Sequence, residues 1–269
     1  MSKPASVNKA LHRGAGSGGR AIILDLTPLA LAYCALVMII AYSARGASGF
    51  GAAAAMPLLA LVIDLKVLIP AWTLIGLAAG LALFGQDRKH IAWEHLLKLA
   101  PGCLIGIVIG LAIFKWLDSE TLALGLGVAV LLYGCYSMWA TFREPAKWTV
   151  PQSIAAPVAG IAGGILGTVL GTMASIFFAI YFDVIRLAGQ NYRATMTGTL
   201  IALGIVRGAG YWAVGEFTTE VLTVFLVSLP VVMIGIFIGN RFHHGMSELA
   251  FKRTVSCALI ASGLALLLR

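Results

Sequence analysis

Charged residues are scarce in this 269-residue chain: Asp, Glu, Lys and Arg make up 11% of it, whereas hydrophobic residues make up 60%. A typical soluble domain carries about a quarter charged residues. A soluble fold of this size would lack the polar side chains that cover a surface in water, but a surface embedded in lipid should be apolar. The composition therefore excludes an ordinary soluble enzyme and predicts a bundle of membrane-spanning helices.

Other chemical groups are also missing. The four cysteines stand singly in apolar segments, without the paired spacing of a metal or redox site, so the sequence predicts no metal and no cofactor. Acidic residues avoid the middle of the apolar segments, which leaves proton coupling without a candidate and the coupling ion open. The net charge is +8, and the basic residues that cause it stand singly in short loops. This distribution is typical of residues that face the cytoplasm and anionic lipid, and not of a nucleic-acid site.

Residues 1–20 form a polar, basic tail, and the apolar stretch that follows is long enough for an uncleaved first spanning helix. No later polar break is long enough to hold a soluble domain. Because the apolar runs are long and lack the alternation of barrel strands, we expect an all-α polytopic membrane protein. The apolar segments are 21–44, 49–63, 67–85, 96–114, 121–141, 152–166, 170–185, 194–213, 220–240 and 249–268.

Two segments of the chain resemble each other. Residues Pro101–Gly110 and Pro230–Gly239 share one Pro, three Ile and two Gly in register, and a Ser-Glu pair follows each segment at residues 119–120 and 247–248. Internal duplication is common in transporters. We therefore predict two homologous halves, 21–141 and 152–269, joined by a loop at 142–151.

Each predicted half opens with an interrupted pair of apolar segments. The interruptions are the glycine-rich stretches Arg45–Gly51 and Gly163–Thr172. The flanking pieces of mostly about 15 residues reach only about 22 Å as helix, short of the roughly 30 Å hydrocarbon core. We expect two broken or re-entrant helix pairs.

The number of crossings depends on those pairs. One net crossing per pair gives eight crossings and parallel halves, whereas two crossings per pair give ten and inverted halves. With a cytoplasmic N-terminus, the eight-crossing arrangement places Arg88, Lys89, Arg143 and Lys147 inside, so the positive-inside rule favours eight over ten.

A helix break inside a membrane frees backbone amides that must face protein or water. The half-helix that follows presents N–H groups and a partial positive charge, which suits an anion. The alternative is that the small residues only allow close helix packing. The candidate substrate-binding residues are Arg45, Ser48, Gly49, Phe50, Gly51, Thr168, Gly171, Thr172, Ser175, Arg193 and Arg207.

Three arginines need separate interpretations. Arg45 abuts the first break, where it either binds an oxyanion or extends from a helix end to the membrane surface. Arg193 and Arg207 lie 14 residues apart, close to four turns, and so share one helix face. For Arg207 we favour an ion pair with Glu216 or Glu220 over a role in the transport pathway.

Two other function classes are compatible with parts of the sequence. Gly46–Gly49 matches the serine motif of intramembrane rhomboid proteases, but that chemistry needs a histidine within a helix, and all five histidines fall in predicted loops or in the tail. An anion channel or a membrane scaffold without coupled transport stays open, as does an oligomer.

The chain resembles the sulfite exporter TauE/SafE family of bacterial membrane permeases. The resemblance covers most of 21–268 and includes Ser48–Pro57, the glycine spacing of 160–171, the Tyr192–Thr195 and Phe251–Arg253 segments, and Arg207 with Tyr211 and Gly215. It implies a multi-pass protein of the bacterial inner membrane that exports sulfite, organosulfonates or related small anions. Family members often carry Gly-Gly-Pro where this chain has Gly171-Thr172-Met173, a difference at the predicted site.

Overall fold

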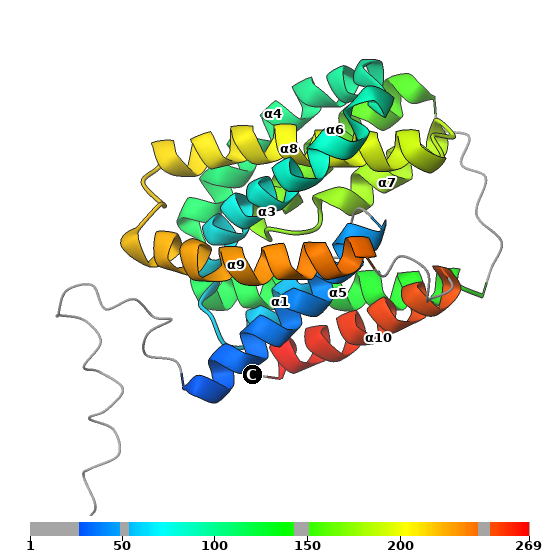
Figure 1. The fold of residues 1–269 in the computed structure, drawn as a ribbon. Coiled ribbons are helices and arrows are strands. Elements are labelled where there is room, and N and C mark those ends of the chain that lie inside the picture. The colour runs from blue at the N-terminus through cyan, green and yellow to red at the C-terminus, as the bar shows by residue number, and fades with distance from the viewer. Residues whose placement is uncertain (1–26, 49–53, 143–150, 242–247, 269) are drawn as a thin grey trace, which may run out of the picture.

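The computed structural model describes residues 27–48, 54–142, 151–241 and 248–268. Within these ranges the chain forms ten α-helices and no strand (Figure 1), which confirms the all-α prediction. The helices are α1 (Pro28–Ser48), α2 (Ala55–Leu59), α3 (Leu65–Asp87), α4 (Trp93–Trp116), α5 (Ser119–Ala140), α6 (Gln152–Val169), α7 (Ala174–Val184), α8 (Gly189–Ala213), α9 (Thr219–Arg241) and α10 (Glu248–Leu267), with the 3₁₀ turn η2 at Arg88–His90.

Six of the described helices are long and apolar enough to cross a membrane. Large apolar side chains are exposed along them, among them Val108 at 68% and Phe237 at 65%. In water such a surface would aggregate, but it matches hydrocarbon. The six spans are Pro28–Arg45, Leu65–Phe84, Trp93–Trp116, Ser119–Ala140, Gln152–Val169 and Thr219–Gly239.

Exposed aromatic side chains mark both ends of the bundle. Trp93 and Trp139 lie exposed at one end, where α4 begins and α5 finishes, while Trp116 and Trp212 lie exposed at the other, where α4 and α8 finish. The 24 residues of α4 rise about 36 Å, close to the roughly 30 Å hydrocarbon core plus part of the headgroup layer. Tryptophan favours this interface, so the two ends correspond to the two membrane surfaces.

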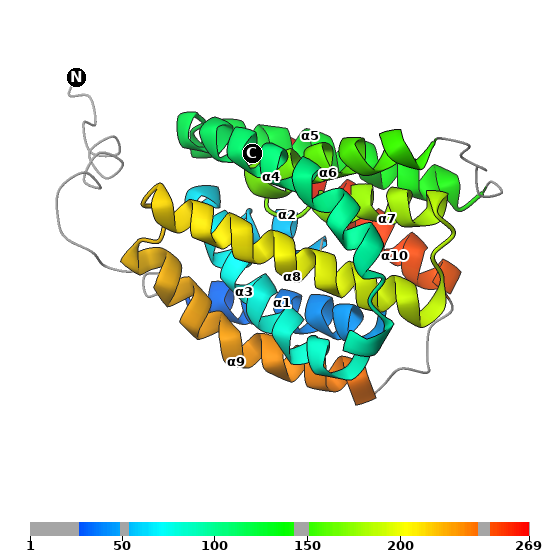
Figure 2. The ribbon, with the colours of Figure 1, turned by 90° about the horizontal axis from the view of Figure 1, so that it is seen from above.

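Figures 1 and 2 show α3 and α8 side by side at the centre of the bundle. Helix α4 packs against α6 on one side of this central pair, and α1 packs against α9 on the other. Helices α5 and α10 pack against each other and form a further pair outside the central one. The central pair also touches both flanks, through α3 against α9 and α8 against α4.

Glycines let the flanking helices approach closely. On α4, a Cβ at Gly102 would lie 2.8 Å from the Pro157 carbonyl oxygen of α6, and a Cβ at Gly106 would lie still closer to the Ile161 carbonyl oxygen. On α9, a Cβ at Gly235 would lie 3.0 Å from the Ile39 carbonyl oxygen of α1. Without a hydrophobic driving force between helices in lipid, such close backbone packing is what holds them together.

The second interrupted pair forms an antiparallel hairpin. Helix α6 finishes at Val169 and α7 begins at Ala174, so the break spans only 170–173. The predicted interruption at Gly163–Thr172 was therefore too long, because Gly163 and Gly167 belong to α6. Phe178 of α7 packs against Gly163, and Ala174 of α7 packs against Gly167. Ile154 and Val184, at the outer ends of the two helices, line one groove, so α7 returns to the level where α6 starts.

The first pair also folds back on itself. Helix α1 continues through Arg45 to Ser48, and Gly49, Phe50 and Gly51 lie outside the described residues. Within the short α2, the Leu58 carbonyl accepts a hydrogen bond of 3.2 Å from the Tyr33 hydroxyl of α1. Since Tyr33 lies in the second turn of α1, the chain has returned to the end of the bundle where α1 began.

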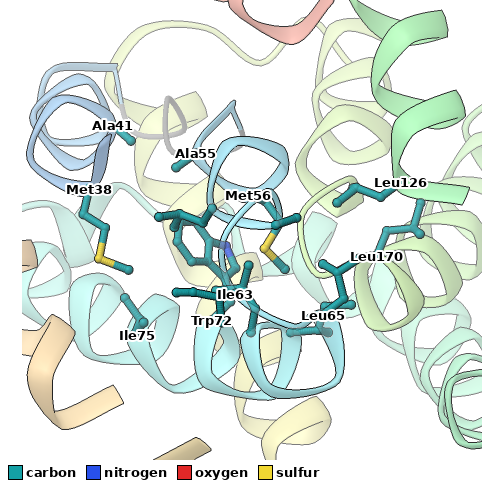
Figure 3. Packing of buried hydrophobic residues seen from close by; sticks show 14 of the residues in the cluster. Met38, Ala41, Ala55, Met56, Ile63, Leu65, Trp72, Ile75, Leu126 and Leu170 are labelled. Atoms are coloured by element: carbon teal, nitrogen blue, oxygen red, sulfur yellow. The ribbon is translucent and has the colours of Figure 1, made fainter. Parts of the chain in front are cut away.

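Bulky apolar side chains fill the space between these elements. Figure 3 shows Met56 of α2 enclosed by side chains of neighbouring helices, among them Trp72 of α3 and Leu126 of α5, together with Leu170 from the α6–α7 break. Met56 and Leu126 are fully buried. The α2 segment is thus anchored by its apolar contacts, although it is too short to be stable alone.

We expect Gly239→Ala to destabilise the protein by about 1–3 kcal/mol, because a methyl group there would overlap the Ser43 backbone of α1. The melting temperature of the detergent-purified protein measures the effect. Gly125→Ala is the matched control, since its Cβ would meet only Leu170 at 3.8 Å. Equal melting temperatures for the two variants would contradict glycine-dependent packing of α9 on α1.

Candidate functional site

A polar cavity of about 60 Å³ lies at the centre of the bundle, between α1, α3, α8 and the α6–α7 break. It exceeds the roughly 10–15 Å³ that one water molecule requires, so a small solute fits. The cavity is lined by Arg45, Trp72, Thr73, Gly76, Leu77, Gly171, Thr172, Ala174, Ser175, Leu200, Leu203, Gly204 and Arg207.

Arg207 reaches the cavity from α8 and is only 7% exposed. One of its guanidinium nitrogens donates to the Gly167 carbonyl in the last turn of α6, while its Nε has no hydrogen-bond partner in the part of the chain that is described. The predicted ion pair with Glu216 or Glu220 is wrong, because neither described carboxylate pairs with Arg207. The C-terminal carbonyls of α6 carry partial negative charge and balance part of the arginine's charge instead.

Arg45 enters the cavity from the last turn of α1 and is likewise 7% exposed. Its Nη2 lies 3.5 Å from the Gly76 carbonyl oxygen of α3, and its guanidinium lies 5.7 Å from the centre of the Tyr42 ring. Its Nε is buried without a partner among the described groups. Arg45 therefore points into the protein and does not extend to the membrane surface.

The α6–α7 break forms a further part of the cavity lining, beside the two arginines. The Tyr211 hydroxyl donates to the Thr168 carbonyl at 2.5 Å, one turn of α8 beyond Arg207, so two side chains of α8 hold the end of α6. The chain then turns at Gly171, whose φ of 77° is in the left-handed region that favours glycine. Helix α7 begins at Ala174, and its first two residues, Ala174 and Ser175, line the cavity, so the helix N-terminus with its partial positive charge lies beside it.

The structure brings five of the predicted site residues to this cavity: Arg45, Gly171, Thr172, Ser175 and Arg207. Two others lie elsewhere. Thr168 is fully buried behind the lining, and Arg193 stands near the start of α8, far from the cavity wall on the same helix. Ser48 is the last residue of α1. Its side chain and residues 49–51 lie outside the part of the chain that the structure describes.

Sequence reasoning missed the contribution of the central helix pair. Gly76 and Thr73 of α3 and Gly204 of α8 line the cavity, and α3 and α8 cross at two reciprocal contacts. A Cβ at Gly80 would lie 2.7 Å from Ile201, and a Cβ at Gly204 would lie 2.9 Å from Leu77. The four-residue glycine spacing on both helices, at 76–80 and 204–208, was the available signal for this crossing.

One histidine lies in an α-helix, contrary to the prediction that all five fall in loops or in the tail. His95 lies in the first turn of α4 and not in a loop, and its Nδ1 is 3.1 Å from the Tyr181 hydroxyl of α7. His95 is not among the residues that line the central cavity. The described residues contain no group of three or more His, Cys, Asp or Glu side chains that could hold a metal ion.

The charged side chains that line the cavity are all positive. Two guanidinium groups and a helix N-terminus lie at it, and no acidic side chain is among the lining residues that the structure describes. An arginine within hydrocarbon is costly unless it is paired or faces water. A negatively charged solute would supply the missing partner, whereas the lining offers no nucleophile with an adjacent base.

A multi-pass helical bundle with a small, cationic central cavity is the architecture of a membrane transporter. The chain matches the family described as Sulfite exporter TauE/SafE over residues 34–266, and it belongs to that family, as the sequence motifs predicted. It is also 24% identical to the probable inner membrane transporter protein TsaS of Comamonas testosteroni over 200 residues, which cover 72% of this chain and 80% of that protein. No solved structure matches. The protein is thus a multi-pass transporter of the inner membrane.

We expect Gly171→Ala to lower the stability by more than Gly189→Ala. Both positions have positive φ, which costs a non-glycine residue about 1–2 kcal/mol, but only at Gly171 would the new methyl group collide with the terminal carbon of Met56. Thermal melting of the two purified variants measures the difference. An equal loss of stability would show that the break tolerates a side chain.

Proposed function

We propose that this protein is a secondary transporter that exports a small oxyanion, such as sulfite or an organosulfonate, across the bacterial inner membrane. The anion binds in the central cavity between Arg45, Arg207 and the first turn of α7. The observation that carries the proposal is the pair of buried guanidinium groups on one cavity, each with an Nε that lacks a partner among the described residues.

The binding chemistry follows from the geometry. Each arginine directs one nitrogen at a backbone carbonyl, Gly167 for Arg207 and, at 3.5 Å, Gly76 for Arg45. The rest of the fork is available for an oxygen pair of a sulfonate, sulfite or carboxylate. Amides at the start of α7 and the hydroxyl of the buried Ser175 contribute further donors.

The choice of substrate rests on the relatives. The family takes its name from sulfite export, and the relative from Comamonas testosteroni is named a probable inner membrane transporter. The cavity itself favours anions by charge and small solutes by size. We therefore assign small sulfur oxyanions as the first substrates to test.

We further propose that the two halves, α1–α5 and α6–α10, are inverted repeats that together make ten crossings. The contacts are reciprocal under an exchange of the halves: α4 on α6 matches α9 on α1, and α3 on α9 matches α8 on α4. The hairpin paths of α1–α2 and α6–α7 each return the chain toward the side where it started, which supports an even number of crossings per pair, two in the ten-crossing arrangement, instead of one. With five crossings per half, the second half is inverted, as in many transporters that alternate access around a central site.

Transport tests the arginine site. In proteoliposomes, labelled sulfite should enter in a saturable manner, and Arg45→Ala and Arg207→Ala should each raise KM by about 10- to 100-fold, because each removes charge-assisted hydrogen bonds. Arg253→Ala is the control, since this exposed arginine packs over Phe142 at the surface. Unchanged KM in both cavity variants would refute the site, and flux that does not saturate would indicate a channel.

Cysteine labelling tests the crossing number. In a variant without the native cysteines, single cysteines replace Arg88, which follows α3, and Glu216, which follows α8. Ten crossings place the two positions on opposite sides of the membrane, whereas eight crossings place them on the same side. A membrane-impermeant maleimide on intact cells should therefore label one variant and not the other, and equal labelling of both would overturn the inverted arrangement.

A further inference from the structure

A second cavity adjoins the central one. It has a volume of about 140 Å³ and lies between α4 and α8, and Cys103 and Ile107 of α4 and Val206 of α8 are among its lining residues. Its surface is almost wholly apolar, and half-exposed Leu104 places its mouth on the lipid-facing side of α4. This cavity differs in character from the arginine-lined cavity of about 60 Å³.

One residue, Leu203, lines both cavities. Along α8, Leu200, Gly204 and Arg207 face the central cavity, whereas Thr199, Ala202 and Val206 face the apolar one. Leu203 lies at the boundary between these two helix faces and is 4% exposed. Its side chain is thus the partition between the polar and the apolar space, one turn of α8 away from Arg207.

We propose that Leu203 determines which anions the transporter accepts, by limiting the size of the apolar substituent beside the charged group. This proposal rests on the anion site proposed above. An anion bound to Arg207 directs its substituent at Leu203, since α8 carries both side chains on neighbouring turns. A small substituent packs against the leucine, and a longer chain collides with it unless the partition is removed.

Removal of the partition should change the chain-length preference in a defined way. With Leu203→Ala, the two cavities join, and a linear chain that starts at the arginines enters the apolar space. Each added methylene that becomes buried there should tighten binding by about fourfold. In Leu203→Phe the side chain between the two cavities is larger, so anions with longer alkyl chains should be excluded more strongly than in the wild type.

The experiment is competition against labelled methanesulfonate uptake in proteoliposomes, with unlabelled methane-, ethane-, butane- and hexanesulfonate as competitors. For the wild type we expect the inhibition to weaken from ethane- to hexanesulfonate. For Leu203→Ala we expect the order to reverse, with butanesulfonate at least tenfold more potent than it is against the wild type. Leu203→Phe should shift the preference in the opposite direction.

Leu200→Ala is the matched control, because Leu200 lines only the central cavity. It removes the same number of carbon atoms from the same helix without joining the cavities, so its chain-length order should equal that of the wild type. Melting temperatures verify that each variant is folded, and if Leu203→Ala does not fold, Leu203→Val and Leu203→Phe provide the two directions of change.

The outcomes separate the two proposals. Failure of the wild type to take up methanesulfonate or sulfite would refute the proposed function itself. Saturable uptake with the same chain-length order in the wild type and the Leu203 variants would overturn the role of Leu203 alone. In that case the apolar cavity takes no part in substrate selection.

Discussion

The end of α6 is the point on which the central structure depends. Inside a membrane the last carbonyls of a helix need donors, because no water is available to satisfy them. Here Arg207 and Tyr211, one turn apart on α8, donate to the Gly167 and Thr168 carbonyls. These contacts allow α6 to finish within the bundle, so that the chain turns at Gly171 and α7 starts beside the cavity.

The same interaction reconciles a buried positive charge with its apolar surroundings. Arg207 is held by the negative end of a helix dipole and not by a carboxylate, so the described residues give the cavity no fixed counter-charge. Arg45 has a weaker contact, because its nitrogen lies 3.5 Å from the carbonyl oxygen of Gly76, which stands in the middle of α3 and not at a helix end. A carboxylate at either position would have satisfied the arginine permanently and competed with an anionic solute.

Close helix packing provides the rigid frame around this site. Glycines on α4 meet α6, and glycines on α9 meet α1, so the repeated segments Pro101–Gly110 and Pro230–Gly239 have the same physical role on opposite sides of the central pair. The crossing of α3 and α8 is reciprocal in the same sense, through Gly80 with Ile201 and Gly204 with Leu77. The two similar segments therefore make equivalent contacts in space, which is the basis of the inverted-repeat proposal.

Sequence alone determined the membrane environment, the helical class and the family, because apolar runs long enough to span and short ordered motifs are local properties of the chain. It also pointed to Arg45, Gly171, Thr172, Ser175 and Arg207, which line the central cavity, since charge and glycine clusters are conspicuous in an apolar chain. Tertiary structure decided the rest: that Arg207 binds a helix end instead of a glutamate, that Thr168 and Arg193 stand away from the cavity, and that Thr73, Gly76 and Leu203 line it. These facts depend on which faces of α3, α6 and α8 meet, and in a helix that is apolar on all sides no sequence period indicates the inward face.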